Sequence, residues 1–145
     1  MSKKVAVILS GCGVFDGAEI HESVLTALRL DQQGAQVSFF APDIQQGHVI
    51  NHITGEEMPE QRNVLIESGR ITRGKTHNIN TLTAADFDAL ILPGGFGVAK
   101  NLSNFAAKGA ECEIEPNTLK AILQFKQAKK PIGLMCISPA LSAKI

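Results

Sequence analysis

Short apolar runs alternate along this chain with stretches of helical periodicity. The runs are rich in β-branched and aromatic residues and stop at Gly, Pro or Ser, which is typical of strands. We expect four strands, over residues 4–9, 36–41, 89–92 and 131–135. Because the first and third runs are almost wholly apolar, they indicate strands covered on both faces. Right-handed crossovers then favour an α/β fold with a flavodoxin-like, open, mostly parallel sheet and helices on both faces.

Two segments between the strands have the periodicity of amphipathic helices. The first lies between Asp16, which we expect to cap it, and Gly34, which ends it. Its apolar positions at helical spacing are Ile20, Val24, Leu25 and Leu28. The second covers residues 116–130. Between them the pattern is weaker and predicts an edge strand within 48–54 and a short helix over 63–71.

Length and charge limit the classes of function. A chain of 145 residues with 44% apolar residues predicts a single domain over 1–145 with one real core. Fourteen basic and fourteen acidic side chains leave no net charge, so we expect neither a nucleic acid nor a membrane as partner. Only about two helical turns fit between Ser138 and Ile145, so the sheet would stop at an uncovered edge strand. We therefore expect the chain to be incomplete at its C-terminus.

The cysteines indicate free thiols. Cys12, Cys112 and Cys136 are odd in number and lack C-x-x-C spacing, which disfavours disulfides and structural zinc. The apolar segment 5–9 is too short for a signal peptide and is interpreted as a strand. Together these features predict a cytoplasmic protein. Cys112 lies in a polar stretch and is expected to be an exposed loop thiol.

Cys136 is the strongest candidate for chemistry. In an open parallel sheet, ligands bind beyond the carboxyl ends of the strands, and Cys136 directly follows the run 131–135. A helix predicted to start at Ser138 would present free N–H groups and its positive dipole end to the sulfur, which favours the nucleophilic thiolate. The alternative is a buried cysteine that simply packs.

Three further groups complete this candidate site. Gly94 and Gly95 follow the strand 89–92 and can turn backbone N–H groups toward a ligand. With the amide of Ile137, one of these amides can form an oxyanion hole beside the thiolate. Glu22, early in the first helix, can reach the same sheet edge and serve acid–base steps. The alternative interpretations are a tight turn for the glycines and a solvated helix residue for Glu22.

Two other motifs carry weaker signals. The spacing Gly11-Cys12-Gly13 with Gly17 departs from the dinucleotide fingerprint, so a nucleotide site is disfavoured. His48 and His52 are four residues apart, but in a segment without helical pattern and without an evident third ligand. We expect no bound metal and no organic cofactor.

Four stretches together resemble a known family. These are ILSGCGVFDGAEIHE, NHITGE, LPGGFGVAKNLSNFA and GLMCISPA. They are similar to the ElbB-like branch of the DJ-1/PfpI superfamily, whose fold is like that of class I glutamine amidotransferases. The resemblance implies that Cys136 is the elbow nucleophile, that Glu22 contacts it, and that Gly95 and Ile137 supply oxyanion amides. Members of the branch are associated with isoprenoid biosynthesis and described as glyoxalases that need no glutathione, and they extend further than this chain.

Two departures from the superfamily narrow the expected activity. Many members have histidine directly after the elbow cysteine, where this chain has Ile137, and others have a histidine later, in a region that this chain does not contain. No Cys-His-acid triad can therefore be assembled from the residues present. Peptidase and amidotransferase activity are therefore disfavoured. We predict a glyoxalase-like lyase that converts glyoxal or methylglyoxal to a 2-hydroxy acid, acting as a homodimer on a small aldehyde. The alternative from another class is a redox-sensing or scaffold protein with an oxidisable Cys136.

Overall fold

Five parallel strands form the centre of the molecule. The computed structural model describes residues 1–145, and its main sheet has the strand order β5-β2-β1-β6-β7 with every neighbouring pair parallel. The strands are β1 (Lys4–Ile8), β2 (Gln36–Ala41), β5 (Thr76–Asn78), β6 (Ala89–Leu92) and β7 (Ile132–Leu134). This architecture confirms the predicted α/β class with an open parallel sheet.

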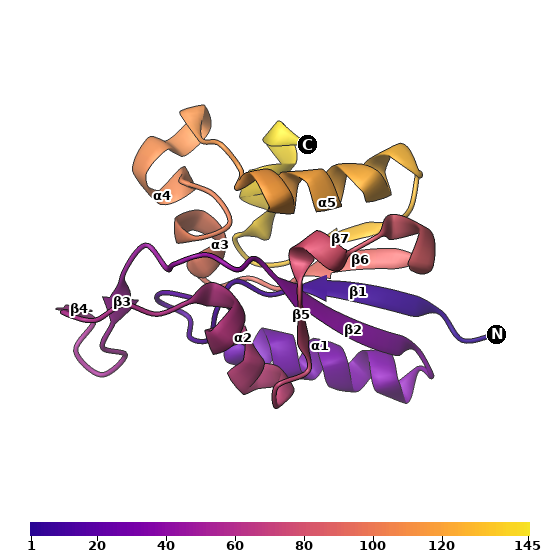
Figure 1. Cartoon of the computed structure of the whole chain (residues 1–145), viewed down its shortest axis with the longest axis horizontal. Coiled ribbons are helices and arrows are strands. Elements are labelled where there is room, and N and C mark those ends of the chain that lie inside the picture. The colour runs from indigo at the N-terminus through magenta and orange to yellow at the C-terminus, as the bar shows by residue number, and fades with distance from the viewer.

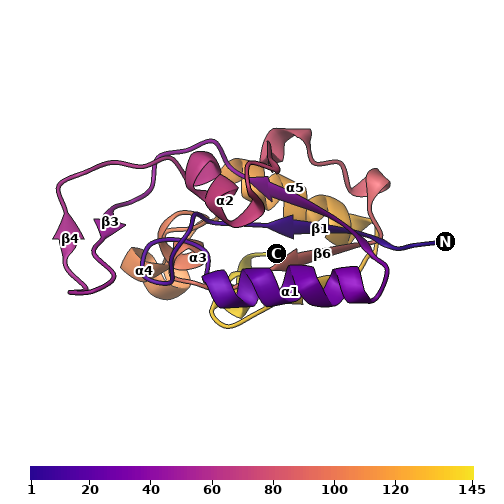
Figure 2. The ribbon, with the colours of Figure 1, turned by 90° about the horizontal axis from the view of Figure 1, so that it is seen from below.

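Helices cover both faces of the sheet (Figure 1). The helices are α1 (Ile20–Gln32), α2 (Val64–Thr72), α3 (Gly97–Lys100), α4 (Phe105–Lys108) and α5 (Pro116–Gln127). The rotated view shows α1 and α5 on opposite sides of β1 (Figure 2). Ile71 of α2 packs with the buried residues on the α1 face. Short 3₁₀ turns lie at Ile79–Thr81, Ala84–Asp86, Gly109–Glu111 and Ser138–Lys144. No helix is long and apolar enough to cross a bilayer.

Side chains of β1 divide the core into two unequal parts. Ala6 and Ile8 join a cluster of 15 buried apolar residues beneath α5, which includes Ile122 and Phe125. The alternate residues Val5 and Val7 belong to a cluster of four on the α1 face. Most of the apolar burial therefore lies on the α5 face.

The first helix forms over the predicted residues, but its apolar stripe faces outward. Ser23 is its only buried residue, while Ile20, Val24, Leu25 and Leu28 remain 41–61% exposed. Periodicity identifies a stripe on a helix but does not say which side the sheet occupies. The chain described here leaves this stripe without a covering element.

Two local predictions were wrong. Asp16 does not cap α1: its Oδ2 accepts a hydrogen bond from Ile50 N–H at 2.8 Å, and the cap is Glu19. The sequence pattern also missed β5, a three-residue edge strand with only polar side chains, paired to β2. The weak pattern near residue 50 corresponds to β3 (Val49–Ile50), which pairs with β4 (Glu57–Met58) in a hairpin that projects from the body (Figure 1).

Candidate functional site

Cys136 lies on a sharp turn between β7 and the C-terminal 3₁₀ turns. Its φ is 55°, a left-handed conformation that a non-glycine residue adopts at a cost of roughly 1–3 kcal/mol. The N–H of Ser138 donates to Met135 O at 2.8 Å and closes the turn, and Ser138 Oγ donates to Pro93 O at 2.8 Å. The side chain of Cys136 is exposed. A strained strand-to-helix turn that presents a nucleophile in this way is the geometry of a nucleophile elbow.

Gly94 brings the end of β6 against this turn. The strands β6 and β7 pair through Leu92 and Leu134, so the residues that follow them are neighbours. A Cβ atom at Gly94 would overlap Cys136 Cβ and lie 2.6 Å from Glu22 Oε2 and 3.1 Å from Cys136 Sγ. The carboxyl of Glu22 and the thiol of Cys136 thus flank the same point, and only glycine fits between them.

Glu22 reaches the site from the first turn of α1. Its Oε2 accepts a hydrogen bond from Gly94 N–H at 2.7 Å, and the side chain is half-buried. No direct hydrogen bond joins the carboxyl to the thiol. A cavity of about 430 Å³ begins beside Glu22 and continues between α1 and the strands, lined mainly by Leu25, Leu30, Ile91 and Met135. Of the two groups, Glu22 lines this cavity, and Cys136 is next to its lining residue Met135 in the chain.

Three backbone N–H groups near the sulfur, those of Gly95, Cys136 and Ile137, have no acceptor within the protein. The groups of Gly95 and Ile137 are the ones expected as oxyanion donors. Gly95 has a φ of 98°, and a Cβ there would overlap Gly17 O and Glu19 N, so the segment that leads into α1 packs directly on this turn. The N–H of Gly94, by contrast, donates to Glu22 Oε2, so it is not free to act as the oxyanion donor that the sequence suggested.

Sequence reasoning missed two residues that organise the surrounding loops. Glu19 caps α1 and accepts a hydrogen bond from Glu22 N–H through Oε2 at 2.6 Å. The buried Asn101 donates to Ser10 O at 2.9 Å and to Asp16 O at 2.8 Å, which joins α3 to the loop before α1. Glu19 could have been found from its spacing, because a side-chain oxygen at the N-cap binds the N–H three residues later. No sequence pattern around Asn101 indicates its role.

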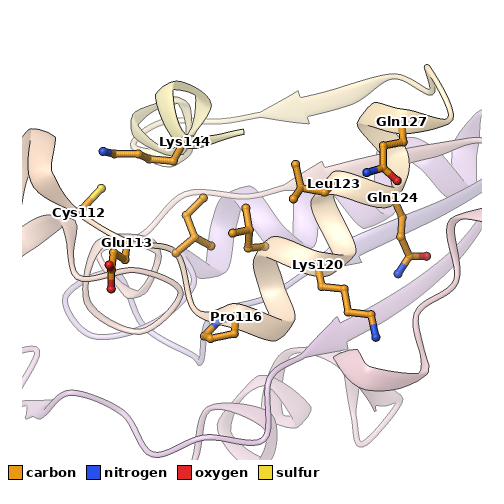
Figure 3. Close-up of a pocket in the computed structure, with 10 residues that line it drawn as sticks. Cys112, Glu113, Pro116, Lys120, Leu123, Gln124, Gln127 and Lys144 are labelled. Carbon is orange, nitrogen blue, oxygen red and sulfur yellow. The ribbon is translucent and has the colours of Figure 1, made fainter.

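The remaining cysteines are apart from this site. Cys112 is buried, which corrects the expectation of an exposed thiol, and it borders a cavity of about 840 Å³ between α5 and the C-terminal turns (Figure 3). Neither Cys136 nor Glu22 lines that cavity. Cys12 is half-buried, and burial, followed by the charge of Glu67, raises the pKa of its thiol.

The histidines do not form a metal or catalytic centre. His52 Nε2 accepts a hydrogen bond from Phe15 N–H at 3.1 Å, and His48 Nδ1 lies 3.7 Å from a carboxylate oxygen of Glu57. His21 pairs with Glu19 on the surface. No group of three potential ligands among His, Cys, Asp and Glu comes together in the structure.

Two mitochondrial proteins are similar in sequence to this chain over nearly its whole length. No protein-family model matches the sequence. The chain is 53% identical over 143 residues to the ES1 protein homolog, mitochondrial, of Rattus norvegicus, and 52% identical to the human glutamine amidotransferase-like class 1 domain-containing protein 3, mitochondrial. Each match covers 98% of this chain and 54% or 53% of the relative, so the chain spans about half the length of these relatives.

Solved structures share the fold. An isoprenoid biosynthesis protein with an amidotransferase-like domain from Ehrlichia chaffeensis has a TM-score of 0.92 and 45% identity, over 96% of this chain and 66% of that one. A two-domain protein from Anabaena variabilis with a DJ-1/ThiJ/PfpI-like domain has a TM-score of 0.57 at 18% identity, over 97% of this chain and 32% of that one, which shows similarity of fold alone. These matches show that the chain has the amidotransferase-like, DJ-1-like fold.

The predicted cytoplasmic location was wrong. The rat and human relatives are both named mitochondrial, which points to mitochondria instead. The sequence reasoning relied on free cysteines and on the apolar segment near the N-terminus, and neither feature distinguishes between two reducing compartments.

Proposed function

We propose that this chain, which has the amidotransferase-like fold of the DJ-1/PfpI superfamily, bears a glyoxalase-like site of the ElbB-like type. The site converts glyoxal or methylglyoxal to the corresponding 2-hydroxy acid without glutathione, metal or organic cofactor. The observation that carries the proposal is the exposed thiol of Cys136 on a left-handed turn, with the Glu22 carboxyl on the other side of Gly94.

The first step is addition of the thiolate to the aldehyde. Cys136 Sγ attacks the aldehyde carbon, the carbonyl π electrons move to oxygen, and a hemithioacetal oxyanion forms. The free N–H groups of Gly95 and Ile137 are the donors that stabilise this negative charge. Gly94 holds the base in place, because its N–H binds Glu22 Oε2.

Proton transfer and hydrolysis complete the reaction. Glu22 removes the proton from the former aldehyde carbon, which gives an enediol, and returns it to the neighbouring carbon. The product on the enzyme is then a thioester of the 2-hydroxy acid. Water attacks this thioester, the carbon–sulfur bond breaks, and the acid and the Cys136 thiol are released. The sum is one aldehyde and one water converted to one hydroxy acid.

Amidotransfer is less well supported, although the human relative is named amidotransferase-like. A Cys-His-acid triad needs a histidine that hydrogen-bonds to the nucleophile. His21 pairs with Glu19, His48 with Glu57, and His52 with the backbone of Phe15. His77, on β5 at the opposite edge of the sheet from β7, lies against Phe40. The names of the relatives support action in mitochondria, and we expect a homodimer.

Substitutions at the two reacting groups test the proposal. Cys136→Ala should abolish lactate formation from methylglyoxal, and Glu22→Gln should lower the turnover number about 10²- to 10⁴-fold, the usual contribution of a positioned acid or base. Cys12→Ala is the matched control, because it removes a thiol outside the site. Turnover by Cys136→Ala at the wild-type rate would refute the mechanism.

A mass measurement distinguishes the proposed lyase from the alternative, a redox sensor. After mild peroxide treatment, a redox sensor would gain two oxygens at Cys136 while the untreated protein forms no lactate. A catalyst would form lactate before treatment and lose activity as the sulfur is oxidised. Intact mass and lactate are read on the same samples.

A further inference from the structure

Three hydrogen bonds form a closed ring at the start of α1. Glu19 N–H donates to Gly94 O at 3.0 Å, and Gly94 N–H donates to Glu22 Oε2 at 2.7 Å. Glu22 N–H then donates to Glu19 Oε2 at 2.6 Å. The ring joins the turn after β6 to the helix that carries the candidate base, and each member is held by the other two.

Within this ring, the side chain of Glu19 contacts neither the Cys136 thiol nor the proposed position of the substrate. Its carboxylate is the N-cap of α1, and its backbone carbonyl accepts from Ser23 Oγ at 2.7 Å. Burial by itself would raise the pKa of Glu19, but hydrogen bonds from Glu22 N–H and His21 outweigh it, so the pKa lies below its ordinary value of 4.5. Near neutral pH the carboxylate is therefore a charged acceptor, which binds an N–H group more strongly than a neutral one.

A second glutamate cap in the same chain provides a comparison. Glu115 caps α5, and its carboxylate accepts from Asn117 N–H at 3.0 Å and from Thr118 N–H at 2.7 Å. Those partners belong to its own helix and lie away from Cys136. Glu115 therefore performs the capping without the connection to the site, whereas Glu19 caps a helix whose third residue is the candidate base.

We propose that Glu19 is a positioning residue: its carboxylate fixes the first turn of α1 so that the Glu22 carboxyl stays on Gly94 N–H beside Cys136 Sγ. This inference rests on the proposed function for its catalytic consequence. The structural role of Glu19 can be tested independently of that function, because loss of the Glu19 carboxylate should free the N–H of Gly94.

The experiment compares Glu19→Ala, Glu19→Gln and Glu115→Ala in the full chain. Amide hydrogen exchange at Gly94, followed by NMR, reads the ring directly. We expect protection at Gly94 to fall about tenfold or more in Glu19→Ala. It should stay within about twofold of wild type in Glu115→Ala and in Glu19→Gln, because glutamine keeps an oxygen for Glu22 N–H. In the lactate assay, Glu19→Ala should lower kcat at least about fivefold with KM nearly unchanged.

The outcomes separate this inference from the proposed function. Unchanged protection at Gly94 in Glu19→Ala, or an equal loss in Glu115→Ala, would overturn the role of Glu19. Failure of Glu19→Gln to restore protection would do the same. If wild-type protein forms no lactate while Gly94 loses protection only in Glu19→Ala, the glyoxalase proposal fails and the positioning role stands.

Discussion

The two faces of the sheet use helices of nearly equal length for different purposes. α5 has 12 residues and buries Thr118, Ala121, Ile122 and Phe125 against the larger core cluster. α1 has 13 residues, buries only Ser23, and exposes its apolar stripe. Both helices begin at a glutamate cap. The difference lies in what they hold, since α5 holds the core together while α1 holds the carboxyl of Glu22 against Gly94.

This comparison implies that stability and site geometry depend on different sides of the molecule. Apolar burial supplies most of the favourable free energy of folding, and most of it lies under α5. On the α1 side, hydrogen bonds and close glycine packing keep the groups of the site together. Three pairs of variants test this division, with expected effects that decrease in size.

Phe125→Ala should have the largest effect. The ring is fully buried in the 15-residue cluster, so its removal leaves a cavity and should cost about 3–5 kcal/mol of the free energy of unfolding. Leu28→Ala on α1 is the counterpart, because its side chain is 49% exposed and its loss should change stability by no more than about 0.5 kcal/mol. Urea denaturation measures both. A similar cost for the two would contradict the division between the faces.

Gly94→Ala should disrupt the site more than the fold. The added Cβ would overlap Cys136 Cβ and press on Glu22 Oε2, so the loops must shift at a cost of about 1–3 kcal/mol. Lactate formation should fall at least about tenfold. Gly69→Ala in α2 is the control, since its Cβ would meet nothing closer than 3.8 Å. Full activity in Gly94→Ala would show that the close approach of these three residues is not required.

A comparison of Cys136→Gly with Cys136→Ala should show the smallest effect. Both variants lack the thiol, but glycine adopts a φ of 55° without steric cost, whereas alanine keeps the strain. The glycine variant should therefore be more stable by about 1 kcal/mol in thermal or urea unfolding. Equal stability of the two would mean that the elbow stores no backbone strain.

The main elements of the fold could be predicted because their patterns are tied to burial. The runs 36–41 and 89–92 coincide with β2 and β6, and the predicted helix 116–130 contains all of α5 and runs past its end at Gln127. β5 was missed because an edge strand of three polar residues has no apolar alternation. The helix α1 was predicted while the exposure of its stripe was not, since periodicity carries no information about the partner surface.

Part of the candidate site could be predicted from the topology of the sheet. Residues after parallel strands meet at one edge, which is why Cys136, Gly94 and Glu22 were expected together and lie together. The hydrogen bond from Gly94 N–H to Glu22 could not be predicted, because it depends on the distance between a helix and a turn from different parts of the chain. The buried state of Cys112 was missed for a similar reason, since the surrounding residues are polar in sequence but α5 and the C-terminal turns lie nearby.

The unequal surroundings of the three sulfurs have a practical consequence. Cys112 is buried, which limits its contact with reagents, and the raised pKa of Cys12 keeps that residue largely in the unreactive thiol form near neutral pH. The side chain of Cys136 is exposed on its turn. A soluble maleimide or fluorescent haloacetamide should therefore attach mainly at one position without mutagenesis, which provides a spectroscopic probe beside Gly94 and Glu22.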